Sequence, residues 1–490
     1  MKKKEHLPLN YIEKNNVKIS FLCSILTLIV LFFLFRQLDY QLIEKPKNQA
    51  IKQAQQEQEE AERIANTPVV TEASVIAVGD NLYHDSLLNV GSNNNWNYDS
   101  IYQHVTSRIQ NADIAMIDQE TVFTTNHDVI AGYPSFATPT EVGDSIIRAG
   151  FNVIESATNH IDDYGVEYIQ QTLDYWKNNY PSIPVLGIHE SQEDADTVKT
   201  MTVNDITFSF LNYTYGTNSG IDTDHSYMID ILEQQKVAQM CAKAKEQSEV
   251  LIFVAHWGKE DEHMPTEHQK QWANFLMKQG VDVVIGGHPH VIQPYGYMSD
   301  NEGHKMLIYY SLGNFVSTQQ KMDELLEAMA SFTVRKTVLK GEKTIEIVNE
   351  SIEPMVMHYN SETGEYGPYM LSDYTEELAS AHGVRDYVGE VFTLENLKKK
   401  FSDVMAINVE PSTKTTFLDV RFTTDGNMED KKTGDWLDDY DSITAETYWK
   451  EHNITSVDTG SQNSSDDYDS DYDSDYDYSY DSDYDSDDSY

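Results

Sequence analysis

The sequence predicts a layered α/β domain that follows a single N-terminal transmembrane helix and precedes a disordered acidic tail. Three observations predict this: an uncharged apolar run near the N-terminus, short apolar runs that alternate with amphipathic stretches, and a C-terminal end built almost only of Asp, Ser and Tyr. Alternating strand and helix patterns are typical of a sheet covered by helices. With 490 residues, 40% of them hydrophobic, the chain can bury a large core.

The composition excludes two classes of protein. A formal net charge of −46 argues against a nucleic-acid binder, because such a chain is repelled by phosphates. Two cysteines are present, Cys23 in an apolar run and Cys241 in an expected helix. They predict no disulfide framework.

The N-terminal region predicts a membrane anchor. Residues 1–18 are polar and contain five lysines, and residues 19–36 form a run whose only charge is the closing Arg36. The run is long enough to cross a bilayer, and the lysines favour a cytoplasmic N-terminus. We therefore expect an uncleaved signal anchor at residues 19–36, with the rest of the chain outside the cell. A cleaved signal peptide is the alternative, but no small-x-small cleavage site follows Phe35.

Residues 37–70 are rich in Gln, Glu and Ala and predict a solvated helical stalk. A coiled coil is the alternative, but no sustained apolar heptad is visible.

The folded domain is expected at residues 71–355. Its strands are expected at residues 74–78, 114–117, 153–156, 183–187, 206–211, 250–255, 281–285 and 307–310, and its helices at 139–149, 165–178, 229–246 and 266–279. Antiparallel strands between residues 331 and 352 are expected at the edge of the domain. Residues 356–453 are expected to be an extension packed on the domain, with helices at 376–382 and 394–401 and a strand at 416–422.

Residues 454–490 are expected to be a disordered tail. From residue 466 onward the tail has no aliphatic side chain and a dense negative charge, so it cannot form a core. It would serve as a solvated spacer. Weak binding of divalent cations and contact with a cationic surface polymer are alternatives.

A metal-ligand pattern follows the strand expected at residues 281–285. Gly286 and Gly287 allow a sharp turn, and His288 and His290 come next. Open α/β sheets place their sites at the carboxyl ends of strands. Two imidazoles one residue apart can face the same metal ion.

Polar residues of ligand type also follow several other expected strands. They are Asp80, Glu120, Asn159, His160 and His256. Because parallel strands bring their carboxyl ends to one edge, these side chains are expected to converge with the two histidines. Oxygen and nitrogen ligands without a thiolate suit one or two divalent ions of Zn, Mn or Fe, which would hold a hydrolytic water. Taken singly, each has a structural explanation, such as a turn for Asp80 or a core imidazole for His256.

The same motifs carry a family resemblance. They are Gly79-Asp80, Glu120, residues 157–165 (ATNHIDDYG), residues 256–260 (HWGKE), residues 287–290 (GHPH) and residues 310–315 (YSLGNF). In these motifs the chain resembles the bacterial capsule-synthesis protein CapA family, which is associated with poly-γ-glutamate capsules and whose fold resembles the calcineurin-like metallophosphatases. The resemblance implies a metallophosphatase-like α/β domain.

The resemblance also implies roles for individual residues. It makes metal ligands of Asp80, Glu120, Asn159, His256, His288 and His290. His160 would be the acid or electrostatic stabiliser near a scissile bond, Glu260 would line the catalytic site, and Asn314 would contact substrate.

Two departures from the pattern stand out. Asp118-Gln119-Glu120 replaces the usual Asn-Leu-Glu, so Asp118 could change the metal preference or become a ligand. The Asp-x-His of true metallophosphatases is missing after the first strand, and the nearest histidine, His84, is out of register. One metal site is therefore expected to lack a nitrogen ligand.

The resemblance implies a membrane-anchored extracellular protein in the synthesis, export or anchoring of an anionic capsule polymer, acting through a metal-dependent, hydrolase-like site. Its expected partners are the polymer and membrane-embedded polymer-synthesis proteins. One alternative is a non-catalytic scaffold of a polymer-export complex, and the other is a metallophosphatase or nucleotidase.

Overall fold

The structure of the protein is a computed structural model that describes residues 9–220, 223–300, 303–412, 420–422 and 428–430. The predicted tail at residues 454–490 lies outside the described residues. Residues 416–419 of the strand expected at 416–422 also lie outside the described residues, as do residues 413–415 and 423–427 on either side of it. Of that strand, Val420–Phe422 (β17) is described, paired with Met428–Asp430 (β18).

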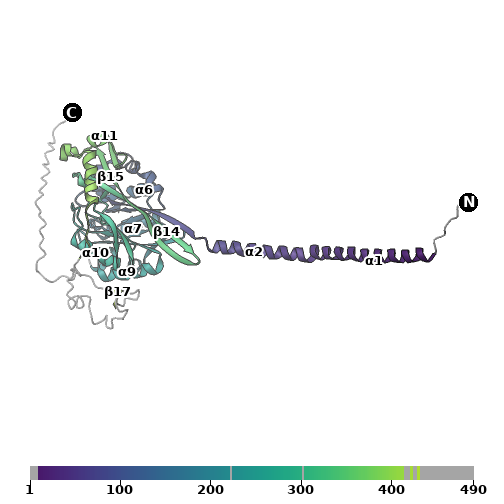
Figure 1. Cartoon of the computed structure of the whole chain (residues 1–490). Helices are drawn as coiled ribbons and strands as arrows, with labels where there is room; N and C mark the ends of the chain where they lie inside the picture. The colour runs from purple at the N-terminus through teal and green to yellow at the C-terminus, as the bar shows by residue number, and fades with distance from the viewer. Residues whose placement is uncertain (1–8, 221–222, 301–302, 413–419, 423–427, 431–490) are drawn as a thin grey trace, which may run out of the picture.

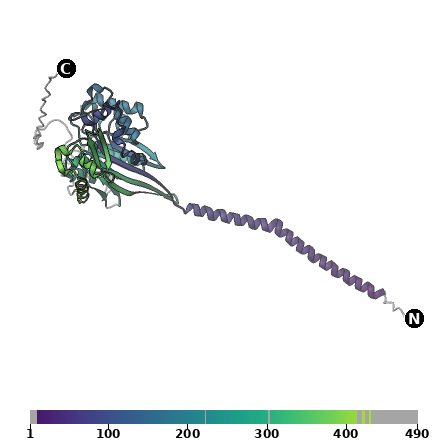
Figure 2. The same ribbon diagram turned by 90° about the horizontal axis from the view of Figure 1, so that it is seen from above.

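A long helical rod precedes the folded body. It consists of α1 (Leu9–Asp39), a π-helical turn (Tyr40–Glu44) and α2 (Lys45–Ala65), and it projects away from the body in every view (Figures 1 and 2). The apolar run at residues 19–35 is exposed throughout, and the rod is the one described helix long and apolar enough to cross a membrane. The side chains of α2 are exposed as well.

The body is built on two sheets. The first has the strand order β16-β15-β14-β1-β2-β5-β6, with β13 paired to β1, and the second has the order β11-β12-β10-β9-β8-β7. The first sheet comprises β1 (Val69–Asn81), β2 (Ile114–Asp118), β5 (Val153–Glu155), β6 (Val185–Leu186), β13 (Asn314–Val316), β14 (Leu326–Leu339), β15 (Glu342–Asn360) and β16 (Glu365–Met370). The second comprises β7 (Lys199–Val203), β8 (Ile206–Thr214), β9 (Val250–His256), β10 (Val283–Gly287), β11 (Tyr295–Ser299) and β12 (Lys305–Tyr309). A small extra pair is formed by β3 (Val122–Thr124) and β4 (Ala137–Pro139).

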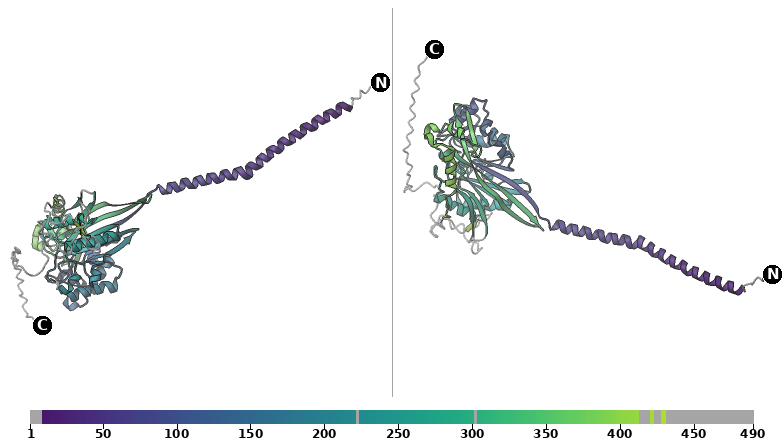
Figure 3. Two further views of the ribbon diagram at one scale, coloured as in Figure 1. Left: turned by 90° about the horizontal axis from the view of Figure 1, so that it is seen from below. Right: turned by 45° about the horizontal axis from the view of Figure 1, so that its top comes forward.

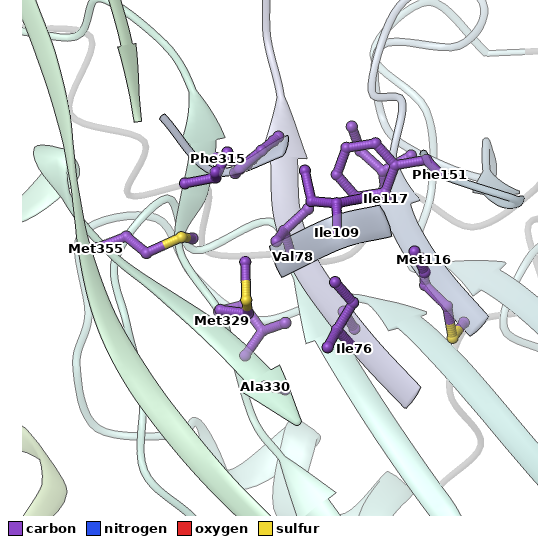
Figure 4. Close-up of a cluster of buried hydrophobic side chains, with 14 of the residues drawn as sticks. Ile76, Val78, Ile109, Met116, Ile117, Phe151, Phe315, Met329, Ala330 and Met355 are labelled. Carbon is purple, nitrogen blue, oxygen red and sulfur yellow. The ribbon is translucent and has the colours of Figure 1, made fainter. Parts of the chain in front are cut away.

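Helices complete the layers. They are α3 (Asp85–Ser92), α4 (Asp99–Tyr102), α5 (Thr106–Gln110), α6 (Thr140–Ala149), α7 (Val166–Asn179), α8 (Gln192–Ala195), α9 (Gln234–Gln247), α10 (Glu267–Lys278), α11 (Glu376–Ser380), α12 (Arg385–Val388) and α13 (Leu394–Met405). Both sheets share one buried core, part of which is drawn in Figure 4, whereas α9 and α10 form a second core with the other face of β9 and β10. The layers are visible in Figure 3. The predicted layered α/β fold class is thus confirmed.

Alternation along β9 shows how the sequence builds these layers. Ile252 and Val254 belong to the core shared by the two sheets, and Leu251 and Phe253 belong to the core beneath α9 and α10. Because successive side chains of a strand point to opposite faces, a strand buried on both faces reads as one continuous apolar run. β9 ends in His256 at the edge where the site lies.

Two sequence predictions about elements need correction. The helix expected at residues 229–246 begins later, at Gln234, because Ile229 and Ile231 form β-bridges with Ile188 and Thr214. The antiparallel strands expected at the edge are larger and more central. β14 pairs with β1 along nine residues, so it lies inside the first sheet. The sequence placed the end of the domain at residue 355. In the structure β15 continues past this residue to Asn360, and β16 pairs with β15.

Candidate metal centre

Three acidic side chains form a row where the strands of the first sheet end. The strand register pairs Asp80 with Asp118, and Asp118 with Glu155. Paired residues on neighbouring strands point to the same face of a sheet. This face looks toward the second sheet, because Asp118 Oδ2 lies 3.0 Å from His256 Nδ1 at the end of β9.

Gly79 makes this row possible. Val78 pairs with Ile117 and Asp80 with Asp118, so Gly79 is one extra residue in β1, a β-bulge. The extra residue turns Asp80 to the face that Asp118 occupies. A Cβ atom at Gly79 would lie 1.8 Å from the carbonyl oxygen of Gly313, so only glycine fits there.

The loop after β10 brings two histidines against the row. His288 and His290 both adopt left-handed backbone conformations, with φ of 91° and 57°. Such values are uncommon outside glycine and concentrate at functional sites. The His288 N–H donates to Asp80 Oδ2 at 3.2 Å. A Cβ atom on Gly287 would lie 2.6 Å from Asp80 Oδ1 and 3.0 Å from Asp118 Oδ2, so this glycine keeps the space between the carboxylates open.

Hydrogen bonds determine which nitrogen of His290 is free. Its Nδ1 lies 3.0 Å from Asp80 Oδ2 and 3.0 Å from Asn314 Oδ1. The amide nitrogen of Asn314 donates to the Glu324 carbonyl oxygen at 2.9 Å, which directs its oxygen toward the imidazole. Two acceptors at Nδ1 require a proton there, so Nε2 is left to bind a metal. Asn314, expected to contact substrate, therefore also orients His290.

The second imidazole, His256, is oriented in the same way. Asp118 accepts from its Nδ1, and its Nε2 lies 2.7 Å from Asn159 Oδ1 and 3.8 Å from Glu120 Oε1. Nε2 of His256 thus faces the oxygens of Asn159 and Glu120, and a cation bound at Nε2 would be shared with them. A carboxylate behind a histidine is the usual way to fix the tautomer of a metal ligand. Asp118, at 3.0 Å from Nδ1, would fix the tautomer of His256 in this way.

The buried carboxylates lack counter-charges. Both oxygens of Glu120, both of Glu327 on β14, Asp118 Oδ1 and Glu155 Oε1 are buried without a hydrogen-bond partner. Within the described ranges, no lysine or arginine forms an ion pair with these four residues or with Asp80. Such groups are costly to bury unless a cation or a proton neutralises them. They therefore fit a divalent metal ion.

The pKa values of the same groups reflect this environment. Burial raises the pKa of Glu120 to about 7, and burial together with the Asp80 charge raises that of Asp118 well above its usual range. Burial acts to lower the pKa of His290, but the charges of Glu120 and Asp80 raise it to about 10. All three shifts arise from negative charge gathered in a buried site, and a bound cation would compensate that charge.

Three groups of side chains have ligand atoms within 4.8 Å of one another. They are Asp80–Glu120–His290, Asp80–Asp118–His256 and Glu260–His288–His290. Because the groups share Asp80 and His290, they form one continuous cluster. Their oxygen and nitrogen donors suit Zn²⁺, Mn²⁺ or Fe²⁺. Of the six ligands expected from sequence, five lie in these groups, and Asn159 joins them through His256.

His160 and His84 lie beside the cluster. Asp163 Oδ2 lies 2.8 Å from His160 Nδ1, and although burial lowers the pKa of His160, this hydrogen bond and the Glu120 charge raise it. His84 belongs to none of the groups above. Its Nδ1 accepts from the Thr318 N–H at 3.3 Å. Among the described residues, His84 is thus not part of the grouped ligand atoms.

Sequence reasoning missed several residues here. Glu155 lies inside the strand expected at residues 153–156, where a carboxylate among apolar residues was the available signal, whereas Glu327 precedes the strands expected from residue 331. The Tyr215 ring lies 4.6 Å from the His288 ring, and Asn218 Nδ2 lies 3.2 Å from His160 Nδ1. Both follow β8, and no sequence pattern marked them.

Comparison with known proteins gives a family match. The sequence model of "Bacterial capsule synthesis protein PGA_cap" matches residues 74–319. The "PGA biosynthesis protein CapA" of Bacillus subtilis (strain 168) is 30% identical over 172 residues, which are 34% of this chain and 43% of the relative. The "Capsule biosynthesis protein CapA" of Bacillus anthracis is 24% identical over 240 residues, 46% and 56% of the two chains. The chain thus spans about half the length of these curated relatives.

Solved structures give weaker similarities. A hypothetical protein from Thermus thermophilus is 13% identical, with 57% of this chain and 100% of that chain covered and a TM-score of 0.33. A structure described as a novel phosphatase from Mycoplasma pneumoniae is 13% identical, with 58% and 95% covered and a TM-score of 0.33. At these TM-scores the similarities say nothing about activity.

Proposed function

The chain belongs to the bacterial capsule synthesis protein PGA_cap family, whose model matches half of it, and from this premise we propose a specific function. The protein would be membrane-anchored and would act outside the cell in the synthesis, export or anchoring of an anionic capsule polymer. It would do so through a metal-dependent, hydrolase-like site. The ligands would be Asp80, Glu120, Asn159, His256, His288 and His290.

The environment of Glu120 is the observation that carries the proposal. Its carboxylate is fully buried, neither oxygen has a hydrogen-bond partner, and its ligand atoms lie within reach of Asp80 and His290. His256 Nε2 lies 3.8 Å from Glu120 Oε1. A carboxylate that only folded the chain would be paired. When bound, a divalent ion would polarise an amide or phosphate oxygen and acidify a water molecule.

The protein's own side chains have separable roles in this proposal. His160, hydrogen-bonded to Asp163, would hold a proton for the leaving group. Asp118 and Asn314 would hold His256 and His290 in the tautomers that leave Nε2 free. Glu260, exposed beside the two histidines of the loop, would face the incoming polymer.

Charge supports a role for a cation in polymer contact. The chain has a formal net charge of −46, and a capsule polymer of the poly-γ-glutamate kind is itself an anion. Two polyanions repel each other unless local positive charge intervenes. A divalent ion held by the buried carboxylates would be the largest positive charge at this edge of the sheets.

Membrane anchoring is supported by the N-terminal rod. Its apolar residues 19–35 have no protein side chains packed over them, and five lysines precede them. Exposure of so long an apolar surface is stable in a bilayer and not in water. The lysines favour the cytoplasmic side for the N-terminus, so the sheets would lie outside.

A non-catalytic scaffold is the second candidate, and the position of His84 favours it. His84 does not reach the metal-ligand groups, so one ion would be held with fewer nitrogen ligands than in a two-metal phosphatase. In this case the sheets would serve only to bind partners that make the polymer.

Complementation separates the two candidates. In a strain that lacks this gene, wild-type protein, His160→Ala and His256→Ala are compared for surface polymer, at equal amounts in the membrane fraction. His104→Ala, on the partly exposed ion pair with Glu365, is the matched control. Loss of an acid or a ligand should lower the polymer at least about tenfold, with full rescue by the control. Full rescue by all three variants would reject the hydrolase-like site and favour the scaffold.

A further inference from the structure

The segment from Leu394 to Ser412 lies beyond the family match and crosses from one core to the other. Leu397 and Val404 on α13 are buried in the core shared by the two sheets. At the far end, Asn274 on α10 donates to the Ser412 carbonyl oxygen at 3.0 Å. The segment therefore joins the two halves of the body near the loop that carries Glu260.

The loop at residues 257–264 connects β9 to α10 and carries Glu260. One side of the loop is tied to the histidine loop by backbone hydrogen bonds. The Trp257 N–H donates to the Gly287 carbonyl oxygen at 3.1 Å, and the Asp261 N–H donates to the Pro289 carbonyl oxygen at 3.0 Å. These bonds explain how an exposed glutamate comes within reach of His288 and His290.

The other side of the loop is held by His263. Its Nδ1 lies 2.8 Å from the Ile292 carbonyl oxygen and its Nε2 lies 3.2 Å from Asp323 Oδ2. The ring therefore bridges the Ile292 carbonyl oxygen and the Asp323 carboxylate. Lys400 Nζ on α13 donates to the same Asp323 oxygen at 2.8 Å. Burial acts to raise the pKa of Asp323, but its hydrogen bonds to His263 and Lys400 lower that pKa below its usual range.

We propose that Lys400, Asp323 and His263 form a clasp through which α13 holds the Glu260 loop against the histidine loop. The clasp would set the affinity of the Glu260–His288–His290 group for a divalent cation. These three are positioning residues, since none belongs to that group. The inference rests on the proposed metal site and adds a contribution from the part of the chain beyond residue 319.

A fully exposed ion pair would hold the loop only weakly, because ion pairs at a protein surface contribute little to stability. Here the partners are only partly exposed, with 31% for Lys400, 32% for Asp323 and 17% for His263. The carboxylate also joins two elements far apart in the sequence. Removing either end therefore loosens the part of the loop around His263, while Asp261 stays paired with Lys321.

Hydrogen exchange of the full-length protein tests the clasp without any metal. Lys400→Met and Asp323→Asn should each speed amide exchange in residues 257–264 at least about threefold, since local opening becomes easier. Lys399→Met is the matched control, because Lys399 lies on the same helix and pairs only with exposed Asp403. The control should exchange like wild type. Unchanged exchange in both test variants would overturn the proposal.

Titration with Mn²⁺ tests the link to the metal. Lys400→Met and Glu260→Gln should each weaken binding about tenfold, the usual effect of losing an orienting group. The double variant should be no weaker than Glu260→Gln, because the clasp acts through Glu260. The proposed link would be overturned if the double variant bound Mn²⁺ more weakly than Glu260→Gln by the factor seen for Lys400→Met alone. It would also be overturned if Lys400→Met exchanged faster in residues 257–264 but bound Mn²⁺ like wild type. A different result would reject the proposed metal site itself, namely unchanged metal binding in a variant without His288 and His290.

Discussion

Replacing both His288 and His290 with alanine is expected to remove bound metal from the purified full-length protein while leaving its fold intact. The two imidazoles belong to two of the three ligand groups. Both histidines have a positive φ, which histidine adopts more readily than alanine, so the fold of the variant is checked by circular dichroism. Metal per chain, measured by mass spectrometry of the element, should fall at least about a hundredfold when the protein is dialysed against trace metal.

The control for this experiment is a second pair of histidines outside the cluster. His104 Nε2 lies 3.9 Å from Glu365 Oε1, and His304 Nε2 lies 2.7 Å from the carbonyl oxygen of Val281, before β10 and away from the site. His104→Ala/His304→Ala should retain the metal content of wild type. Equal metal in wild type and in the variant without His288 and His290 would mean that the ion lies elsewhere.

Replacing Gly79 with alanine is expected to destabilise the whole domain. The new Cβ would lie 1.8 Å from the Gly313 carbonyl oxygen and 2.9 Å from its carbonyl carbon, and backbone atoms cannot rotate away. Either β13 separates from β1 or the bulge is lost and Asp80 turns away from Asp118. Overpacking of this kind should lower the free energy of unfolding by about 3 kcal/mol or more, and Tm by about 6–12 °C in a thermal scan.

Gly296 provides the matched control for this substitution. It also lies within a strand, β11, without a positive φ, and a Cβ atom there would meet nothing within 4 Å. Gly296→Ala should therefore unfold within about 2 °C of wild type. An unchanged Tm for Gly79→Ala would show that β1 and β13 are not packed as described.

Much of the site could be predicted because strand ends are visible in a sequence. Apolar runs ending in Asp80, His256 and His288 mark the carboxyl ends of parallel strands, and such ends meet at one edge. The family resemblance supplied Glu260 and Asn314 in addition. Each predicted strand end was visible in a short stretch of sequence, and one rule, that the carboxyl ends of parallel strands share an edge, placed these ends together.

The rest depends on contacts between distant segments. Glu155 joins the acidic row only because β5 pairs with β2 in a particular register. The central place of β14 was missed because alternation shows which face is buried and not which strand is the neighbour. His263 reaches Lys400 through Asp323 across more than a hundred residues, and no local pattern encodes such a contact.

The position of a bound ion tests the central claim most directly. Crystals of the protein grown with Mn²⁺ should give their strongest anomalous difference peak among Asp80, Glu120 and His290, within about 2.2 Å of their ligand atoms. Such a peak would show that side chains from both sheets meet around one cation. A strongest peak outside this cluster, or the lack of any peak in it, would contradict the account.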